Sequence, residues 1–320
     1  MDITVVSLNP CIDWQWTTPA FVYGGLNRAK SGERYASGKG INVCSALKNL
    51  GLDPLCVGFN FHENGALITG ALDEWGVRHD FVTVDGAVRV NIKLYDDAAG
   101  TMTELNQPGA FVPEDGVLEF HRKIEALGRA ESSRKRPLAE DILVLSGSMP
   151  AGVPVDTYKR LCETWPGRVI LDADGEALRL ALQGERPPYC VKPNLFELTN
   201  SFGVELPTRE SIAAFCRGLI AEHGVTIICV SMGADGAMLV TGSDAFYVPA
   251  PAVAVRGVQG AGDAMVAGLA YGLAQGLPAP ELLRVATAAA AASVVREGTL
   301  MCTGEGFRKY LAEVEVPLLI

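Results

Sequence analysis

The chain lacks any run of about eighteen apolar residues without polar interruption, the length that a membrane-spanning helix needs. The most apolar stretch, Ala286 to Val295, is closely bracketed by Arg284 and Arg296. A basic surface is also missing, because 27 Lys and Arg stand against 37 Asp and Glu, for a formal net charge of -10. We therefore expect neither a membrane nor a nucleic acid as a partner.

Paired cysteines and histidine clusters are missing as well. The eight cysteines show no CxxC pair and no zinc-ligand spacing, and the four histidines form no chemical constellation. Most cysteines lie in apolar segments, which predicts small core residues of a reduced protein with a cytoplasmic location. The first residues predict a strand and not a signal peptide.

Short apolar, β-branched segments alternate with helical patterns along the 320 residues. This alternation predicts an α/β fold whose mostly parallel sheet is covered by helices on both faces. The clearest predicted strands are 3–8, 55–59, 142–145, 169–171 and 227–230. The clearest predicted helices are 41–50, closed by Gly51, 65–75, closed by Gly76, and 264–273.

Two segments interrupt this rhythm, Ile12 to Tyr35 and Val88 to Asn106. They are richer in polar and aromatic residues, and the second alternates apolar with polar positions as a half-exposed strand does. We predict that they pair as a small β-sheet lid, with residues 12–35 and 88–106 in the lid and 1–11, 36–87 and 107–320 in the core. An open strand edge in this lid needs cover, which predicts a homodimer through the lid. Residues 132–137 predict a basic surface turn.

The segment Gly260-Ala261-Gly262-Asp263 precedes the predicted helix 264–273. Small residues at a helix start leave backbone N–H groups free, and with the helix dipole they form an anion site. Asp263 has two interpretations there. It is either a general base in a kinase that phosphorylates an alcohol, or a residue that caps the helix.

Two other glycine-bearing segments have similar alternatives. Ser37-Gly38-Lys39-Gly40-Ile41-Asn42 precedes a helix and is either a ligand-binding turn or a plain tight turn. It is not a Walker A loop, because Gly40 follows Lys39 where Ser or Thr is needed. Ser231-Met232-Gly233-Ala234-Asp235-Gly236 predicts a hairpin whose backbone can also lie along a nucleotide.

Polar residues follow several predicted strands, at the sheet edge where α/β proteins bind ligands. Asp13 can hold sugar hydroxyls or serve as a turn residue. Asn194 and Glu197 can reach one Mg²⁺, or they can form a capping box. Arg89 lies on the same side of its strand as Asn91, and it either clamps a phosphate or makes a surface salt bridge.

Taken together, these motifs resemble the ribokinase-like sugar kinases, and among them the phosphofructokinase B family. The resemblance rests on five segments in the family's order, namely residues 5–13 (VVSLNPCID), 37–43 (SGKGINV), 145–150 (LSGSMP), 192–194 (KPN) with Glu197, and 260–263 (GAGD). Residues 5–13, 38–40 and 146–150 are more similar to 1-phosphofructokinases and tagatose-6-phosphate kinases than to ribokinases.

The resemblance implies a three-layer α/β/α sandwich with a β-sheet lid, ATP and Mg²⁺. It implies Asp263 as the catalytic base, with Gly260, Ala261 and Gly262 as an anion hole. Sugar-binding positions would be Asp13, Gly38, Lys39 and Asn42, and sugar-phosphate positions Arg89, Asn91, Ser148 and Arg28. Nucleotide positions would be Lys192, Ser231, Gly233, Gly236 and Gly262, and metal positions Asn194 and Glu197.

The sequence departs from the family at Ser37, at Gly257-Val258-Gln259 and at the bulky Trp14 and Trp16. The expected function is an ATP-dependent kinase for a phosphorylated ketohexose, either fructose 1-phosphate or tagatose 6-phosphate. Two alternatives stay open at this point, a kinase for an unphosphorylated sugar or nucleoside and a catalytically silent sensor of sugar or nucleotide.

Overall fold

The computed structural model describes residues 2–129, 140–257, 259–298 and 300–320. The basic turn predicted at 132–137 lies outside these residues. The larger of two sheets has ten strands in the order β14-β13-β12-β11-β10-β9-β8-β1-β4-β5. In chain order these strands are β1 (Ile3–Ser7), β4 (Leu55–Glu63), β5 (Arg78–Ala87), β8 (Ile142–Ser146), β9 (Arg168–Asp172), β10 (Cys190–Val191), β11 (Ile227–Ser231), β12 (Ala237–Val240), β13 (Ala245–Val248) and β14 (Leu318–Leu319).

The large sheet is parallel from β5 to β11 and antiparallel only at the edge formed by β12, β13 and β14. Strands β1 and β8 are buried along their whole length, as expected for parallel strands covered on both faces. The predicted mostly parallel α/β sheet is therefore confirmed, with an antiparallel edge that begins at the predicted hairpin after β11.

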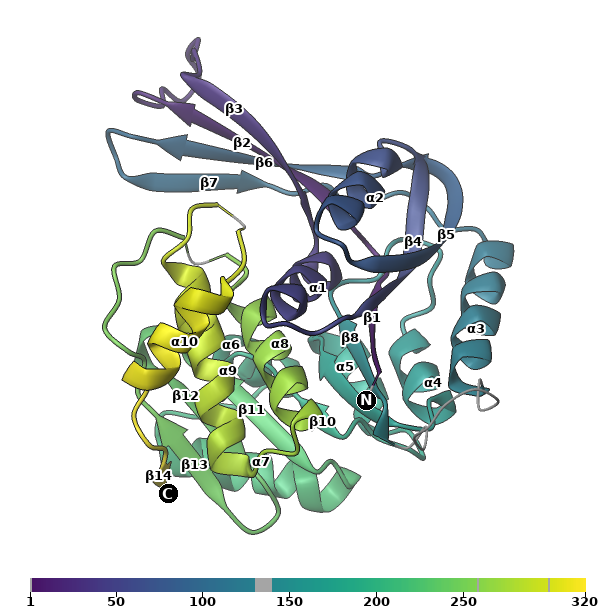
Figure 1. Ribbon diagram of the computed structural model, residues 1–320, viewed down its shortest axis with the longest axis vertical. Helices are drawn as coiled ribbons and strands as arrows, with labels where there is room; N and C mark the ends of the chain where they lie inside the picture. Colours follow the sequence, from purple (N-terminus) through teal and green to yellow (C-terminus); the bar gives the residue numbers. More distant parts are fainter. Residues whose placement is uncertain (1, 130–139, 258, 299) are drawn as a thin grey trace.

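Helices cover both faces of this sheet (Figure 1). On one side α1, α8, α9 and α10 pack in sequence, and on the other α3, α4, α5 and α6 do so. The helices are α1 (Lys39–Asn49), α2 (Gly65–Glu74), α3 (Glu114–Arg129), α4 (Thr157–Thr164), α5 (Gly175–Leu182), α6 (Leu195–Phe202), α7 (Arg209–His223), α8 (Ala261–Ala274), α9 (Ala279–Val294) and α10 (Gly304–Glu313).

The second, smaller sheet projects from one end of the core, at the top of Figure 1. Its strand order is β3-β2-β6-β7, formed by β2 (Cys11–Thr18), β3 (Ser31–Ser37), β6 (Arg89–Asp96) and β7 (Thr101–Leu105). The two segments that interrupt the α/β rhythm thus pair with each other, and the predicted separate sheet is confirmed. In the residues described, the helices include none with the length and apolar character needed to cross a bilayer.

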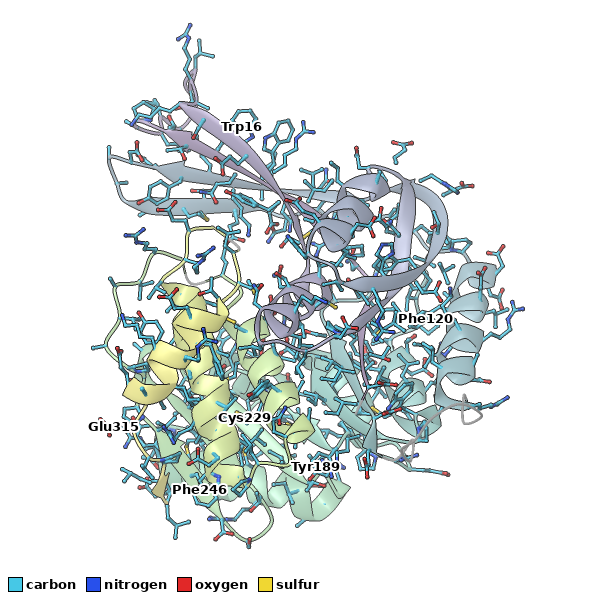
Figure 2. The ribbon with its side chains drawn as sticks, in the orientation of Figure 1. Trp16, Phe120, Tyr189, Cys229, Phe246 and Glu315 are labelled. Atoms are coloured by element: carbon cyan, nitrogen blue, oxygen red, sulfur yellow. The ribbon has the colours of Figure 1, made fainter. Side chains whose placement is uncertain are left out.

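The small sheet buries its polar side. Asn91 and Lys93 are buried on β6, whereas Ile92 between them is 41% exposed. Trp14 and Trp16 lie on β2 directly opposite Ile92 and Leu94 and therefore share that outer face, and Figure 2 shows Trp16 on the small sheet. Strand β6 does alternate apolar and polar residues as predicted, but the polar residues Asn91 and Lys93 are the buried ones.

Buried small residues bring the helices that carry the site close to their neighbours. All eight cysteines are free and buried, which confirms that they are core residues. A Cβ at Gly40 would lie 2.7 Å from Val6 O, so glycine allows α1 to pack directly on β1. Within the predicted turn at residues 37–42, Gly40 therefore allows close packing of α1 on β1.

We expect Gly40→Ala to destabilise the fold by about 1–3 kcal/mol, because the added methyl group overpacks the contact of α1 with β1. Gly70→Ala is the matched control, since no heavy atom lies within 4 Å of its added Cβ on exposed helix α2. Urea unfolding should show a lower midpoint for the first variant and an equal or higher midpoint for the second. Equal midpoints for the two variants would contradict the packing argument.

Candidate active site

A cavity of about 1440 Å³ lies between the two sheets. The small sheet lines it with residues of β2, β6 and β7, and the core lines it with α1, the start of α8 and the ends of β9 and β11. Of the residues named from the sequence, the cavity brings together Asp13, Gly38, Lys39, Asn42, Arg89, Asn91, Lys192, Asn194, Glu197, Ser231, Gly233, Gly236, Gly260, Ala261, Gly262 and Asp263. Ser148 and Arg28 do not line it.

Asp263 lies in the first turn of α8, and the turn before it places backbone amides at the cavity. Gly260 is the N-cap residue, with a φ of 75° that favours glycine. The amides of the first helical turn have no partner inside the helix, which leaves them available to an anion. Gly260, and not Asp263, occupies the capping position of α8. The interpretation of Asp263 as a helix cap is therefore wrong.

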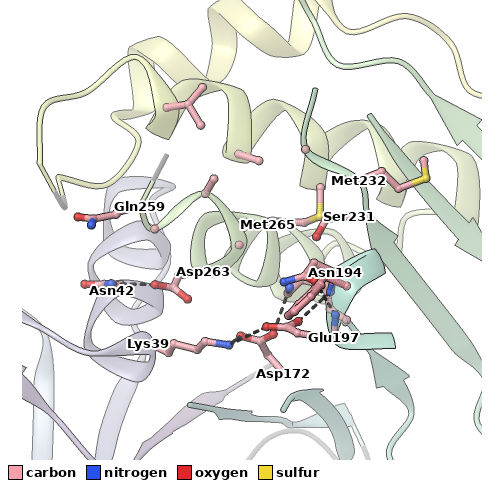
Figure 3. Close-up of a pocket in the computed structure, with 18 of the residues that line it drawn as sticks. Lys39, Asn42, Asp172, Asn194, Glu197, Ser231, Met232, Gln259, Asp263 and Met265 are labelled. Carbon is pink, nitrogen blue, oxygen red and sulfur yellow. Dashed lines mark hydrogen bonds and ion pairs between the residues drawn. The ribbon is translucent and has the colours of Figure 1, made fainter. Parts of the chain in front are cut away.

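The Asp263 carboxylate is buried and accepts a hydrogen bond from Asn42 Nδ2 at 2.7 Å, as Figure 3 shows. Burial and the nearby Asp172 carboxylate raise the pKa of Asp263 to about 6, although Lys39, Asn42 and Lys192 act in the opposite direction. A carboxylate with a pKa close to neutrality is suited to accept and release a proton.

Asp172, at the end of β9, forms ion pairs with Lys39 and Lys192. Its Oδ2 lies 3.2 Å from Lys39 Nζ, and its Oδ1 lies 3.1 Å from Lys192 Nζ. Ser146 donates a hydrogen bond to Oδ2 at 2.9 Å. Burial opposes ionisation, but Lys192 and Lys39 outweigh it and hold the pKa of Asp172 at about 2. Burial lowers the pKa of Lys39, yet Asp172, Glu197 and Asp263 together raise it above its usual value.

Asn194 and Glu197 form the predicted capping box at the start of α6. Asn194 Oδ1 accepts from the Glu197 amide, and Glu197 Oε2 accepts from the Asn194 amide, both at 2.8 Å. The other carboxylate oxygen, Glu197 Oε1, lies 3.8 Å from Lys39 Nζ at the cavity wall. A single carboxylate oxygen fits Mg²⁺, which usually keeps several waters and binds substrate phosphates alongside few protein ligands.

Asp13 is held on the other side of the cavity by the small sheet. Lys93 Nζ lies 2.7 Å from Asp13 Oδ2, and Asn91 donates to Oδ1 at 3.1 Å. Asp13 and Lys93 are only 2% and 5% exposed, so this ion pair is shielded from water. The sequence interpretation missed Lys93, because only the parallel register of β2 with β6 brings the two residues together.

Arg89 is tied to the backbone where the small sheet leaves the core. Its guanidinium donates to Asn9 O at 3.2 Å and to Gln107 O at 3.1 Å. Asn9 Nδ2 in turn donates to Ser148 Oγ at 3.2 Å, and Ser148 does not line the cavity. Arg28 is exposed on the loop between β2 and β3. Neither Ser148 nor Arg28 is brought to the cavity of this chain.

The turn after β11 supplies backbone to the far end of the cavity. Ser231, Gly233 and Gly236 all line it, and β11 and β12 pair as the predicted antiparallel hairpin. A short 3₁₀ turn, Gly233–Asp235, joins the two strands. Apolar side chains also line the cavity, namely Val253, Val255, Ala290, Ala291 and Val294.

Asp172 was also missed from the sequence. It follows the predicted strand 169–171 directly, so its place at a carboxyl end was a usable signal. Gln259 was noted only as a departure, and the structure places it on the cavity wall beside Gly260.

Comparisons with known proteins agree with this geometry. Residues 2–304 match the model of the pfkB family carbohydrate kinases. The chain is 33% identical to a 1-phosphofructokinase of Bacillus subtilis over 99% of this chain and 100% of the relative, and 37% identical to one of Rhodobacter capsulatus over 89% and 88%. Phosphofructokinase-2 from Escherichia coli, solved with potassium, has a TM-score of 0.89 and 26% identity over 97% and 98% of the two chains.

The hydrogen bond from Asn42 stabilises the charged form of Asp263, so we expect Asn42→Ala to raise the pKa of Asp263 above about 6. Carbon-detected NMR titration of the aspartate carboxyl groups measures this pKa, and the signal missing in Asp263→Asn assigns it. An unchanged or lower pKa in Asn42→Ala would contradict the role of this hydrogen bond.

Proposed function

The chain belongs to the pfkB family of carbohydrate kinases, which are phosphotransferases with an alcohol acceptor, and we propose that it transfers the γ-phosphoryl group of ATP to a hydroxyl of a phosphorylated ketohexose. Fructose 1-phosphate is the first candidate and tagatose 6-phosphate the second. The relatives named 1-phosphofructokinase support this order.

One observation carries the proposal. Two buried carboxylates share one cavity wall, yet the pKa of Asp172 is held near 2 and that of Asp263 is raised to about 6. Groups driven apart in this way take different roles. Asp172 stays ionised and fixes two lysines, whereas Asp263 is able to accept a proton near neutral pH.

In the proposed reaction, Asp263 accepts the proton of the substrate hydroxyl as that oxygen bonds to the γ-phosphorus and the bond to the leaving ADP oxygen breaks. The amides of Gly260, Ala261 and Gly262 stabilise the charge on the transferring group. A Cβ at Gly262 would lie 3.6 Å from Lys192 Nζ, so that ammonium group is close to the same anion site.

The remaining positions divide between the two substrates. Asp13, Gly38, Asn42 and Asn91 would hold sugar hydroxyls, and Arg89 would face the sugar phosphate. Lys39 is ion-paired with Asp172, and it would serve the sugar from that position. Ser231, Gly233 and Gly236 would lie along the nucleotide. Glu197, with Asn194, would hold Mg²⁺, whose charge neutralises that of the phosphates.

The outer face of the small sheet supports a homodimer in which two such lids cover each other. Trp14, Trp16, Ile92, Leu94 and Leu105 share this face, and Leu105 is 67% exposed. A contiguous apolar face of this kind is typical of a protein interface. Eight free, buried cysteines support a cytoplasmic location.

We expect Asp263→Asn to lower kcat by about 10²–10⁴-fold, because the proton acceptor is lost while the backbone amides remain. The affinity for nucleotide should change little. Asp85→Asn is the control, since Asp85 is fully exposed far from the cavity lining. A coupled assay with ATP and fructose 1-phosphate gives kcat, and near-normal turnover in Asp263→Asn would refute the assignment of the base.

Asp263→Asn should also stabilise the fold. A pKa of about 6, in place of 3.8, means that the folded protein binds this proton more tightly than the unfolded chain does. Folding therefore loses stability as the pH rises from about 4 to 6, on the order of 3 kcal/mol at pH 7. Thermal unfolding should give a higher Tm for the variant at pH 7.5 and nearly equal values at pH 4.

A substrate panel tests the class of sugar. We expect the highest kcat/KM with fructose 1-phosphate or tagatose 6-phosphate, and at least tenfold lower values with free fructose and with nucleosides, because Arg89 lines the cavity beside Asn91. Preference for an unphosphorylated substrate would refute the phosphate role of Arg89. Ligand-dependent melting without turnover of ATP would refute the kinase assignment itself.

Light scattering tests the proposed dimer. The unmodified protein should have the mass of two chains. The Ile92→Glu variant should have the mass of one chain, because it places a charge at the centre of the apolar face. Leu118→Glu is the matched control, since Leu118 is 53% exposed on α3. A monomeric unmodified protein would remove this interface.

A further inference from the structure

The side chain of Gln259 connects the turn before α8 to the small sheet. Gln259 precedes Gly260, the N-cap residue of α8, and Figure 3 shows it near Asn42 and Asp263. Its Oε1 accepts a hydrogen bond from Lys93 Nζ on β6 at 2.5 Å. Its Nε2 donates to Glu104 Oε1 on β7 and lies 3.4 Å from Met102 Sδ. One side chain directly before the turn of Gly260 to Gly262 thus contacts two strands of the small sheet.

The polarity of this bridge matches the amide group. The amide oxygen faces the cation of Lys93, and the amide nitrogen faces the anion of Glu104. Of the side chains of this length, an amide alone presents an acceptor and a donor side by side. Lys93 and Glu104 are directly opposite on β6 and β7, so one amide group reaches a cation and an anion at the same register position.

Lys93 extends the bridge to the candidate sugar site. The same ammonium group contacts Asp13 Oδ2 at 2.7 Å, and both residues are buried. Asp13, Lys93 and Gln259 therefore form one chain of polar contacts that ends one residue from Gly260. On its other side Gly260 is confined by Met301, whose Cε would lie 2.2 Å from an added Cβ. The anion-hole turn is thus held between Met301 and the small sheet.

We propose that Gln259 is a positioning residue that couples the small sheet to the anion-hole turn, so that engagement of the sugar at Asp13 fixes Gly260 to Gly262 and Asp263 for transfer. This inference rests on the proposed function. Gln259 does not touch the reacting atoms in this account. Its contribution is to hold the small sheet with Asp13 and the turn of Gly260 to Asp263 at fixed positions relative to each other. The rate of phosphoryl transfer depends strongly on such positioning.

Three variants test the bridge through its polarity. Gln259→Glu places a carboxylate against Glu104 and repels β7, while it keeps an acceptor for Lys93. Glu104→Gln alone keeps an acceptor for the Gln259 amide and should have little effect. In the double variant Gln259→Glu/Glu104→Gln, the carboxylate at 259 still accepts from Lys93 and now also accepts from the amide at 104, so both contacts are restored and only the 259–104 hydrogen bond changes direction.

The kinetic measurement uses the full chain with ATP and fructose 1-phosphate. We expect Gln259→Glu to raise the KM for the sugar phosphate and to lower kcat, each about tenfold, with the KM for ATP within twofold of the unmodified value. The double variant should regain most of both losses. Losses that multiply in the double variant, or no loss in Gln259→Glu, would overturn the proposal, because a structural defect at 259 is not repaired at 104.

A second measurement does not depend on catalysis. Hydrogen exchange of the ligand-free protein should be faster across residues 89–105 in Gln259→Glu and should return to the unmodified rate in the double variant. Unchanged exchange in Gln259→Glu would overturn the bridge even in an active enzyme. Absence of turnover by the unmodified chain would instead count against the proposed function, and the exchange result would still decide whether Gln259 ties the small sheet to the turn before α8.

Discussion

The site depends on how two buried carboxylates share two lysines. Asp172 contacts both Lys39 and Lys192, whereas Asp263, among the residues described, has no ion pair within 4 Å and receives only the amide of Asn42. The cations therefore favour ionisation of Asp172 more than that of Asp263. The pKa of one acid falls to about 2 and that of the other rises to about 6. Without Asp172, the two lysines would lower the pKa of Asp263 and make it a weaker base.

Packing makes this division of charge possible. Gly40 brings α1 onto β1, and Gly268 brings α8 close to α9, where an added Cβ would lie 2.7 Å from Ala286 Cα. Asn42 on α1 and Asp263 on α8 then meet across the interface of their helices, 221 positions apart in the chain. Close packing at buried small residues fixes the two helices, so Asn42 and Asp263 are held in place for this hydrogen bond in the folded protein.

The small sheet reverses the usual relation between polarity and burial. Asp13, Asn91 and Lys93 are buried on it where they line the cavity, and Lys93 pairs with Asp13. Its apolar side chains are partly exposed, Ile92 and Leu105 among them. The polar groups of this sheet therefore line the cavity, and part of its apolar surface is exposed.

The sequence by itself determined the α/β class, the turn at Gly260 to Gly262 and the capping box of Asn194 with Glu197, because each depends on residues close together in the chain. It also marked residues 12–35 and 88–106 as a separate sheet through their polar and aromatic composition. The tertiary structure alone decided which partners the charged groups have. The pairing of Lys93 with Asp13 required the parallel register of β2 with β6, and the choice of Asp172 as the partner of Lys39 required the fold to bring the end of β9 to the start of α1. Electrostatic energies depend on distance in space, and local sequence patterns do not fix distances between segments far apart in the chain.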